Sequence, residues 1–162
     1  MTGLTFPLDI SINSSRAIFT AFINGKALDC MLDTGADISV FCKGAGLFQE
    51  FIKGMDGVTE IKKFSLGGFG VARENTMLWR FQCFNFSDKS GNSINYTGML
   101  MAVSSKPNIP CDLILGITMF MKMRYMVDAL SKKQFLYIES EKRNYGVGFY
   151  RNKEVPYIFA KD

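Results

Sequence analysis

The sequence contains no histidine, and this absence excludes several kinds of catalysis. Among its 162 residues there is no imidazole to carry protons near neutral pH. A Ser-His-Asp triad, a Cys-His pair and a His-ligated zinc site are therefore excluded. A hydrolase of this composition could still work by pairing two carboxylates around one water molecule.

Cysteine is scarce as well. The four cysteines are far apart in the sequence, and none forms the C-x-x-C pair that is typical of zinc or thiol redox sites. We interpret them as small buried apolar residues rather than as disulfide partners. They are Cys30, Cys42, Cys83 and Cys111.

Long hydrophobic runs are missing too. No window of the sequence approaches the ~18 apolar residues that a membrane-spanning helix needs. Met1 to Asn13 show neither the basic nor the apolar region of a secretory signal peptide. We therefore expect a soluble, cytoplasmic protein with no membrane partner.

The charge is nearly balanced, with a formal net charge of +4. The excess lies in residues 122–162, where Lys132, Lys133, Lys142 and Arg143 could contact nucleic acid. Acidic residues interrupt this region, however, which favours a solvated surface. No nucleic-acid partner is expected.

The chain has the length of one domain, and its apolar residues alternate with polar ones over many short segments, which is typical of a mainly β fold. Asn24-Gly25 predicts a type I′ hairpin between strands at 17–23 and 26–32. Helix is expected only at 117–127 and, for one or two turns, at 47–53. Further strands are expected at 6–12, 38–41, 61–66, 71–80, 81–86, 94–103, 113–115, 134–138, 145–150 and 155–160.

The strongest chemical signal is the turn at Asp33. This aspartate follows the apolar strand end Met31-Leu32 and precedes Gly35, whose missing Cβ lets backbone amides approach the carboxylate. Thr34 could add a hydroxyl hydrogen bond. The turn therefore holds a carboxylate in the orientation that a two-carboxylate hydrolase needs.

Two segments together resemble the retroviral-type aspartic proteases, or retropepsins: Leu32-Asp33-Thr34-Gly35-Ala36-Asp37 and Leu113-Ile114-Leu115-Gly116. A glycine-rich hairpin lies between them, and the resemblance covers residues 5–127 in order. It implies a closed β-barrel of the acid-protease type, with one short helix and one lobe per chain, over residues 1–138. Residues 139–162 are then a C-terminal extension of that domain: extra strands, an interface arm, or a segment removed by self-cleavage.

The resemblance implies roles for individual residues. Asp33 would be the catalytic aspartate, Thr34 would form hydrogen bonds across a dimer, and Gly35 would help to hold the carboxylates coplanar. Asp37 would contact the substrate backbone, and residues 67–70 would form a flap over the substrate. The candidate substrate-binding residues are therefore Ala36, Asp37, Gly67, Gly68, Phe69, Gly70 and Ile114.

The sequence also departs from the retropepsin pattern. Where retroviral members carry an arginine after the apolar-Gly strand, this chain has Ile117-Thr118. Asp37 therefore lacks its usual ionic partner unless Lys122 or Arg124 reaches back to it. Residues 43–53 also look like an insertion before the flap.

Only one Asp-Thr-Gly turn occurs in the chain, so a second carboxylate has to come from a second copy. A twofold axis would bring Asp33 against Asp33 of the partner, where the two carboxyls share one proton, as is known for aspartic-protease dyads. The resemblance thus implies a homodimeric endopeptidase that cleaves extended peptides without a metal or cofactor. The alternative is a catalytically inactive relative that serves as a dimerisation or peptide-binding module.

Overall fold

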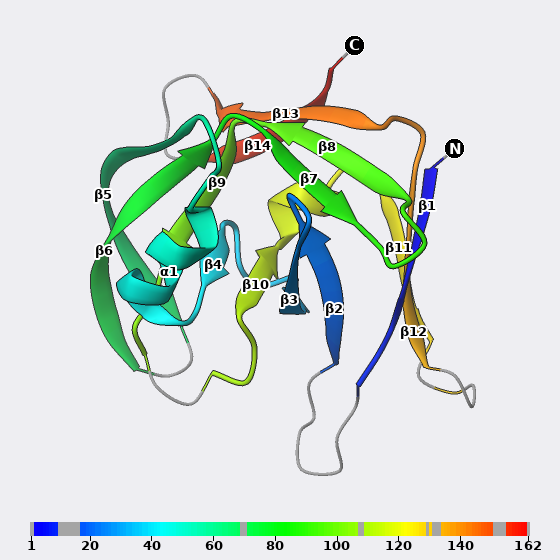
Figure 1. Cartoon of the computed structure of the whole chain (residues 1–162), viewed down its shortest axis with the longest axis horizontal. Helices are drawn as coiled ribbons and strands as arrows, with labels where there is room; N and C mark the ends of the chain where they lie inside the picture. The colour runs from blue at the N-terminus through cyan, green and yellow to red at the C-terminus, as the bar shows by residue number, and fades with distance from the viewer. Residues whose placement is uncertain are drawn as a thin grey trace.

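The computed structural model of the chain describes residues 2–9, 17–68, 71–106, 109–128, 130, 134–150 and 155–161 (Figure 1). In these ranges most of the regular secondary structure is β-strand. The strands are β1 (Thr2–Pro7), β2 (Ile18–Ile23), β3 (Lys26–Asp33), β4 (Ser39–Phe41), β5 (Val58–Gly68), β6 (Val71–Phe81), β7 (Phe84–Ser87), β8 (Ser93–Thr97), β9 (Met99–Val103), β10 (Leu113–Gly116), β11 (Arg124–Asp128), β12 (Phe135–Ser140), β13 (Asn144–Phe149) and β14 (Pro156–Ala160). The helical elements are α1 (Gly44–Ile52) and the 3₁₀ helix η1 (Ile117–Phe120).

The strands form two sheets. The larger sheet has the order β14-β13-β8-β7-β2-β3-β10-β4-β9-β6-β5, and the smaller has the order β1-β12-β11. The predicted mainly β architecture is confirmed. In the described part of the chain the larger sheet is open, and β14 does not pair with β5 to close it into the expected barrel.

The hairpin predicted at Asn24-Gly25 is confirmed. Both residues have positive φ, 49° and 81°, as a type I′ turn requires. Lys26 at the start of β3 donates to the carbonyls of Phe51 at 2.7 Å and Lys53 at 2.9 Å. A cation here satisfies the free carbonyls at the C-terminal end of α1, so the hairpin and the helix hold each other in place.

The short strand β10 crosses the centre of the larger sheet. It runs parallel to β3 and antiparallel to β4, and all four of its residues are buried. The continuous apolar run Leu-Ile-Leu is typical of a strand covered on both faces. The β3–β10 register places Gly116 opposite Asp33.

The predicted helix at 117–127 is wrong. Only Ile117–Phe120 are helical, and Arg124–Asp128 form β11 against β12. A mixed run of Met, Phe and Ile has no clear period, so pairing with a distant strand decides its conformation. The α-helix of the described chain is instead α1. It lies at the other predicted helical segment, 47–53, and inside the insertion at 43–53.

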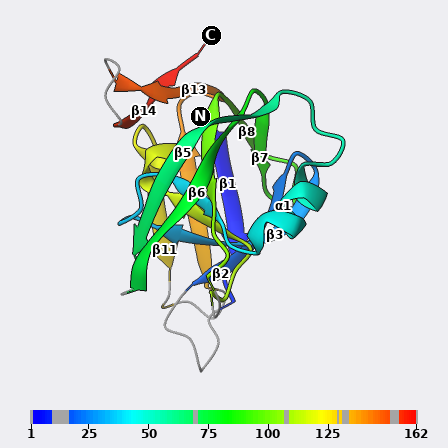
Figure 2. The same ribbon diagram turned by 90° about the vertical axis from the view of Figure 1, so that its left-hand side faces the viewer.

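Aromatic rings fill the space under α1. Phe48 and Phe51 are buried and lie 5.4 and 5.5 Å from the ring of Phe41, centroid to centroid. Figure 2 shows α1 beside the β2–β3 hairpin. The insertion therefore adds a packed helix and leaves the sheet order around β3, β10 and β4 unbroken.

The strand predicted at 94–103 is interrupted. Gly98 has a φ of 82°, and a Cβ there would lie 2.8 Å from the carbonyl oxygen of Val147. This left-handed glycine separates β8 from β9. β8 pairs with β13, whereas β9 continues the sheet between β4 and β6.

The chain beyond residue 138 contributes to both sheets. β12 spans this position, and β13 pairs in parallel with β8. The division into a domain of residues 1–138 and an extension stays a prediction. Within the described residues, no helix has the length and apolarity that crossing a bilayer requires.

Of the four cysteines, Cys30, Cys42 and Cys111 are buried and form no disulfide, as expected for small apolar residues. Cys83 is exposed, which the sequence interpretation missed.

Candidate active site

Asp33 is the last residue of β3 and is half-buried. Its Oδ1 accepts a hydrogen bond of 2.9 Å from the Gly35 N–H, and its carbonyl accepts one of 3.1 Å from the Ala36 N–H. A Cβ on residue 35 would lie 3.3 Å from the same Oδ1. The turn therefore fixes one carboxylate oxygen and leaves the other free to act on a ligand.

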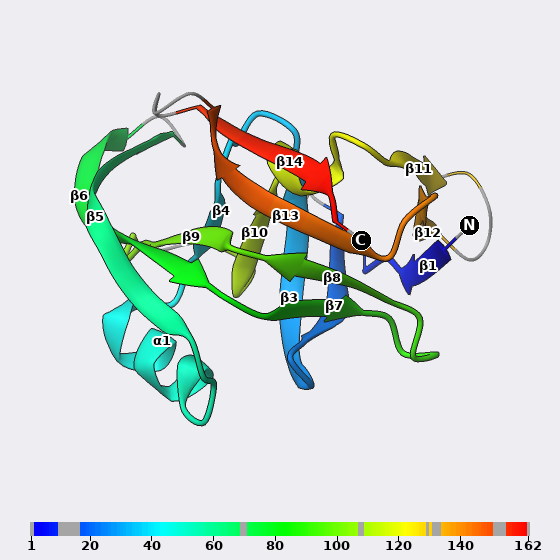
Figure 3. The same cartoon turned by 90° about the horizontal axis from the view of Figure 1, so that it is seen from above.

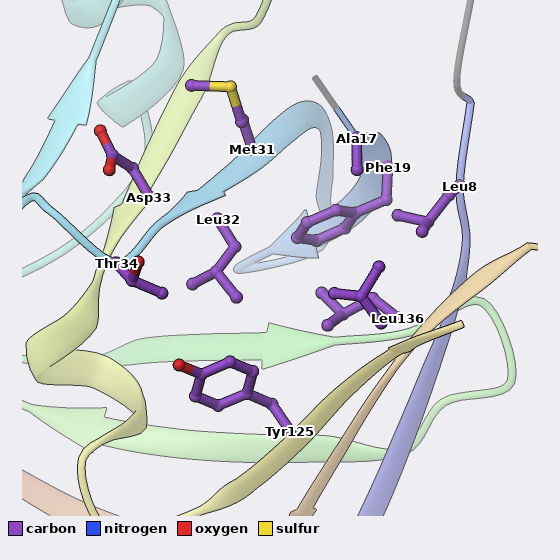
Figure 4. Close-up of a pocket in the computed structure, with 10 residues that line it drawn as sticks. Leu8, Ala17, Phe19, Met31, Leu32, Asp33, Thr34, Tyr125 and Leu136 are labelled. Carbon is purple, nitrogen blue, oxygen red and sulfur yellow. The ribbon is translucent and has the colours of Figure 1, made fainter. Parts of the chain in front are cut away.

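Successive residues of β3 face opposite sides, as strand geometry requires. In Figure 4 the Asp33 carboxylate points away from Leu32 and from Tyr125 of β11. Two different surfaces therefore meet at the end of β3, one on the carboxylate side and one on the Leu32 side.

The carboxylate side is apolar. Met31, Val40, Cys42, Ile109, Cys111 and Ile114 form a buried cluster there, which we call the Met31 cluster. Half-buried Ala36 and Leu66 pack against it. Leu66 belongs to β5, so the end of the β5–β6 hairpin is brought to the same cluster as the turn that follows Asp33.

The structure describes only part of the predicted flap. The β5–β6 ladder extends to the pair Gly68–Val71, and Gly67 is exposed. Phe69 and Gly70 lie outside the described residues. Ile114 is 1% exposed within the Met31 cluster, so in the isolated chain it supports the floor beside Asp33 rather than facing an open pocket.

Thiol chemistry at this cluster is disfavoured. Two effects raise the pKa of the Cys42 thiol far above its usual value: the larger is a hydrogen bond with the Cys111 side chain, and the second is burial. The thiolate is the nucleophilic form of cysteine. Cys42 therefore acts as a buried packing residue of the Met31 cluster.

Gly116 lets the Asp33 turn pack against β10. A Cβ at this position would lie 2.8 Å from the carbonyl carbon of Ile38 and 3.0 Å from the oxygen of Ala36. The Gly116 N–H donates to the buried Ser39 hydroxyl at 3.1 Å. The backbone of β10 at Gly116 thus packs directly against the backbone of the Asp33 turn.

Thr118 holds the segment at Ala36-Asp37. Its hydroxyl donates to the Asp37 carbonyl at 2.6 Å, and the Ile117 N–H donates to the Ala36 carbonyl at 2.8 Å. Ile117-Thr118 therefore hold this loop by hydrogen bonds to the loop's own backbone carbonyls. These two residues stand where retroviral members carry an arginine. The Asp37 side chain is exposed.

Lys122 and Arg124, the suggested ionic partners of Asp37, line a separate cavity of about 200 Å³. They share it with Glu139, Ser140 and Glu141.

Glu74 ties β6 to the segment after β9. Burial alone would raise the pKa of its carboxyl, but the Ser105 N–H and the hydroxyls of Ser104 and Ser105 donate to it at 2.8–3.0 Å. These bonds, helped by nearby Lys106, hold the pKa of Glu74 below its usual value. The inner strand of the hairpin, β6, is thus fixed a short way from the hairpin tip.

A cavity of about 550 Å³, open to the surface, lies at the end of β3 and is lined by Met31 and Asp33 as well as by Leu32 (Figure 4). Asp33 and Thr34 form one end of it, and Tyr125 and Val127 of β11 line another part. The remaining lining residues are Leu8, Ala17, Phe19, Met31, Leu32 and Leu136.

Sequence reasoning missed three features of this site. The hydroxyls of Ser39 and Thr118 form hydrogen bonds with backbone groups that are distant in the sequence, and no sequence motif indicates such bonds. The cavity depends on β11, which was predicted as helix. The available signal was the pattern Arg-Tyr-Met-Val-Asp, whose aromatic and β-branched residues favour a strand.

No group of three or more potential ligand residues in the described ranges could hold a metal ion.

No protein-family model and no curated protein matches this chain. Among solved structures it is similar to a retropepsin-like aspartic protease from Rickettsia conorii, with a TM-score of 0.52 and 13% identity over 85% of this chain and 90% of that one. It also matches EIAV protease in complex with the inhibitor HBY-793, with a TM-score of 0.40 and 26% identity over 69% of this chain and 91% of that one. The fold of the chain is retropepsin-like.

Proposed function

We propose that this chain is one half of a homodimeric aspartic endopeptidase. The observation that carries the proposal is the Asp33 carboxylate, held by the Gly35 N–H at the end of β3 and bordered by an apolar surface. The retropepsin-like fold agrees with this assignment. Asp33 would be the catalytic residue of each copy, with Thr34 and Gly35 shaping the turn around it.

Two carboxyls that approach across a twofold axis cannot both be ionised, so they share one proton. The ionised Asp33 takes a proton from water while the protonated Asp33 of the second copy polarises the scissile carbonyl. The water oxygen bonds to the carbonyl carbon, the C–N bond breaks, and the leaving amine takes up a proton from the pair. No covalent enzyme intermediate and no metal takes part.

The substrate we propose is an extended peptide lying between the β5–β6 hairpin and the Asp33 turn. An extended chain can be recognised through its backbone, while alternate side chains enter pockets. Gly67, Gly68, Phe69 and Gly70 would form the flap above it, and Ala36 and Asp37 would lie beside it. Ile114 would support the apolar floor.

This function is tested by incubating the purified chain with a mixture of extended peptides and identifying the products by mass spectrometry. Cleavage is expected, a statine-type transition-state mimic should suppress it, and its pH profile should be bell-shaped because the pair needs one proton. Peptide binding without any cleavage across the acidic and neutral range would favour the inactive binding module instead.

A further inference from the structure

The β5–β6 hairpin extends beyond the part of the sheet that supports it. β6 pairs with β9 only as far as Leu78, whereas β5 and β6 stay paired as far as Gly68 and Val71. Seen from above, β5 and β6 run together along one side of the molecule, and β9 lies against them over only part of their length (Figure 3). We call residues 63–68 and 71–77 the hairpin arm. A two-stranded hairpin is at best marginally stable by itself, so the position of the arm depends on its contacts with the rest of the chain.

Apolar side chains attach the β5 strand of the arm, and polar side chains attach its β6 strand. Phe64 and Leu66 pack against buried residues of the core, and Leu66 also packs against the Met31 cluster. On β6, the Thr76 hydroxyl donates to the carbonyl of the last residue of β9 at 2.5 Å. Glu74 lies nearer the tip and is opposite Leu66 in the strand register. The two strands of the arm are therefore attached at the same level, one by Leu66 and the other by Glu74.

The Glu74 carboxylate accepts three hydrogen bonds from one short segment. The Ser104 hydroxyl donates to Oε2 at 2.8 Å, and the N–H and hydroxyl of Ser105 donate to Oε1 at 2.9 and 3.0 Å. Hydrogen bonds to an ionised acceptor are stronger than those between neutral groups. We call these three residues together the Glu74 contact.

The Ser104 end of the Glu74 contact is fixed within the central sheet. Ser104 is 1% exposed, its N–H donates to the Phe41 carbonyl at 2.7 Å, and its carbonyl accepts from the Gly44 N–H at 3.0 Å. Phe41 is the last residue of β4, which pairs with β10, and β10 in turn pairs with the strand that ends at Asp33. The Glu74 contact therefore joins the arm to the same group of strands that positions the catalytic turn.

We propose that Glu74 is a positioning residue for peptide cleavage, because its contact holds the tip of the β5–β6 hairpin in place over a peptide bound at Asp33. This inference rests on the proposed function, in which that hairpin covers the substrate. Glu74 acts through the arm and takes no part in the chemistry at Asp33. An arm that is correctly placed in only about a tenth of the molecules lowers the apparent affinity for peptide about tenfold.

The proposal is tested with Glu74→Ala, whose side chain can accept none of the three hydrogen bonds. KM for a cleaved peptide should rise about tenfold while kcat stays within about twofold, because the Asp33 pair is unchanged once the peptide is covered. Glu74→Gln keeps the shape and one acceptor oxygen of the side chain. Its KM should lie between those of Glu74→Ala and the unmodified protein.

Glu60→Ala is the matched control. Glu60 is an exposed residue of β5 in the same hairpin, and it pairs in register with Trp79, where the hairpin is still part of the sheet. This variant removes the same charge and should leave KM unchanged. Ser104→Ala should raise KM by itself but should not raise it further in a Glu74→Ala background, since the Ser104 hydroxyl acts on the arm only through Glu74.

Hydrogen exchange gives a measurement that needs no cleavage. The amides of residues 74–77 should exchange about tenfold faster in Glu74→Ala than in the unmodified protein, because the arm opens more often. The amides of residues 113–115 in the buried strand β10 should exchange at an unchanged rate. This difference separates release of the arm from a general loss of stability.

The inference is overturned if KM is unchanged in Glu74→Ala, or if kcat falls by more than KM rises. If Glu74→Ala does not fold, the same comparisons are made with Glu74→Gln. A protein that cleaves no peptide contradicts the proposed function, and hydrogen exchange then decides whether Glu74 holds the arm. Faster exchange at residues 74–77 would support the Glu74 contact, and unchanged exchange there would overturn it.

Discussion

Asp33→Asn is expected to abolish peptide hydrolysis. Asparagine has the same shape, and its side-chain oxygen can still accept the hydrogen bond of 2.9 Å from the Gly35 N–H. It cannot take up a proton from water, and in a homodimer both catalytic carboxyls are lost at once. The rate should fall by about 10⁴-fold or more, at the upper end of what general acid–base catalysis contributes.

The control is Asp56→Asn, which removes an exposed carboxylate in the turn after α1. This variant should keep full activity. Asp33→Asn should keep the melting temperature and sedimentation coefficient of the unmodified protein, so that loss of chemistry is separated from loss of structure. Residual cleavage within tenfold of the unmodified protein would remove Asp33 from the catalytic role.

Gly116→Ala is expected to destabilise the protein strongly, because the added methyl group has no room beside the Asp33 turn. The new methyl group would lie 2.8 Å from the carbonyl carbon and 3.0 Å from the nitrogen of Ile38, and 3.0 Å from the oxygen of Ala36. These are backbone atoms of the Asp33 turn, which cannot move away as a flexible side chain can. Overpacking costs about 1–3 kcal/mol, and rigid neighbours favour the upper end.

For a chain of this size, a loss of about 3 kcal/mol lowers the melting temperature by about 6–12 °C. Gly46→Ala is the matched control. It lies in α1 with no atom within 4 Å of its added methyl group, and should stabilise the protein by about 0.5–1 kcal/mol because alanine favours a helix. Calorimetry that finds the two variants equally stable would contradict the packing described under Asp33.

The parts of the fold that local sequence determines were predictable. Asn24-Gly25 fixes a hairpin by backbone conformation alone, and Leu113-Ile114-Leu115 has the apolar run of a covered strand. Residues 117–127 were not predictable in this way, because β11 exists through its pairing with β12. The hydrogen bond of Thr118 was not predictable for the same reason, because the carbonyl that accepts it, at Asp37, lies 81 residues away in the sequence.

The candidate site divides in the same manner. Asp33, Thr34 and Gly35 form a local turn, so their motif was readable, and the Gly35 bond to Asp33 agrees with it. The apolar floor could not be read, since it joins Met31, Leu66 and Ile114 from three different strands. The exposed face of β11 became visible only when the strand order put it at an edge.

The central claim is that two copies of Asp33 complete one active site, and the concentration dependence of activity tests it most directly. Sedimentation velocity and specific activity are measured on the same dilution series. Specific activity should fall in proportion to the dimer fraction and vanish as the protein becomes monomeric. Undiminished cleavage by a species that sediments as a single chain of 18.2 kDa would contradict the account.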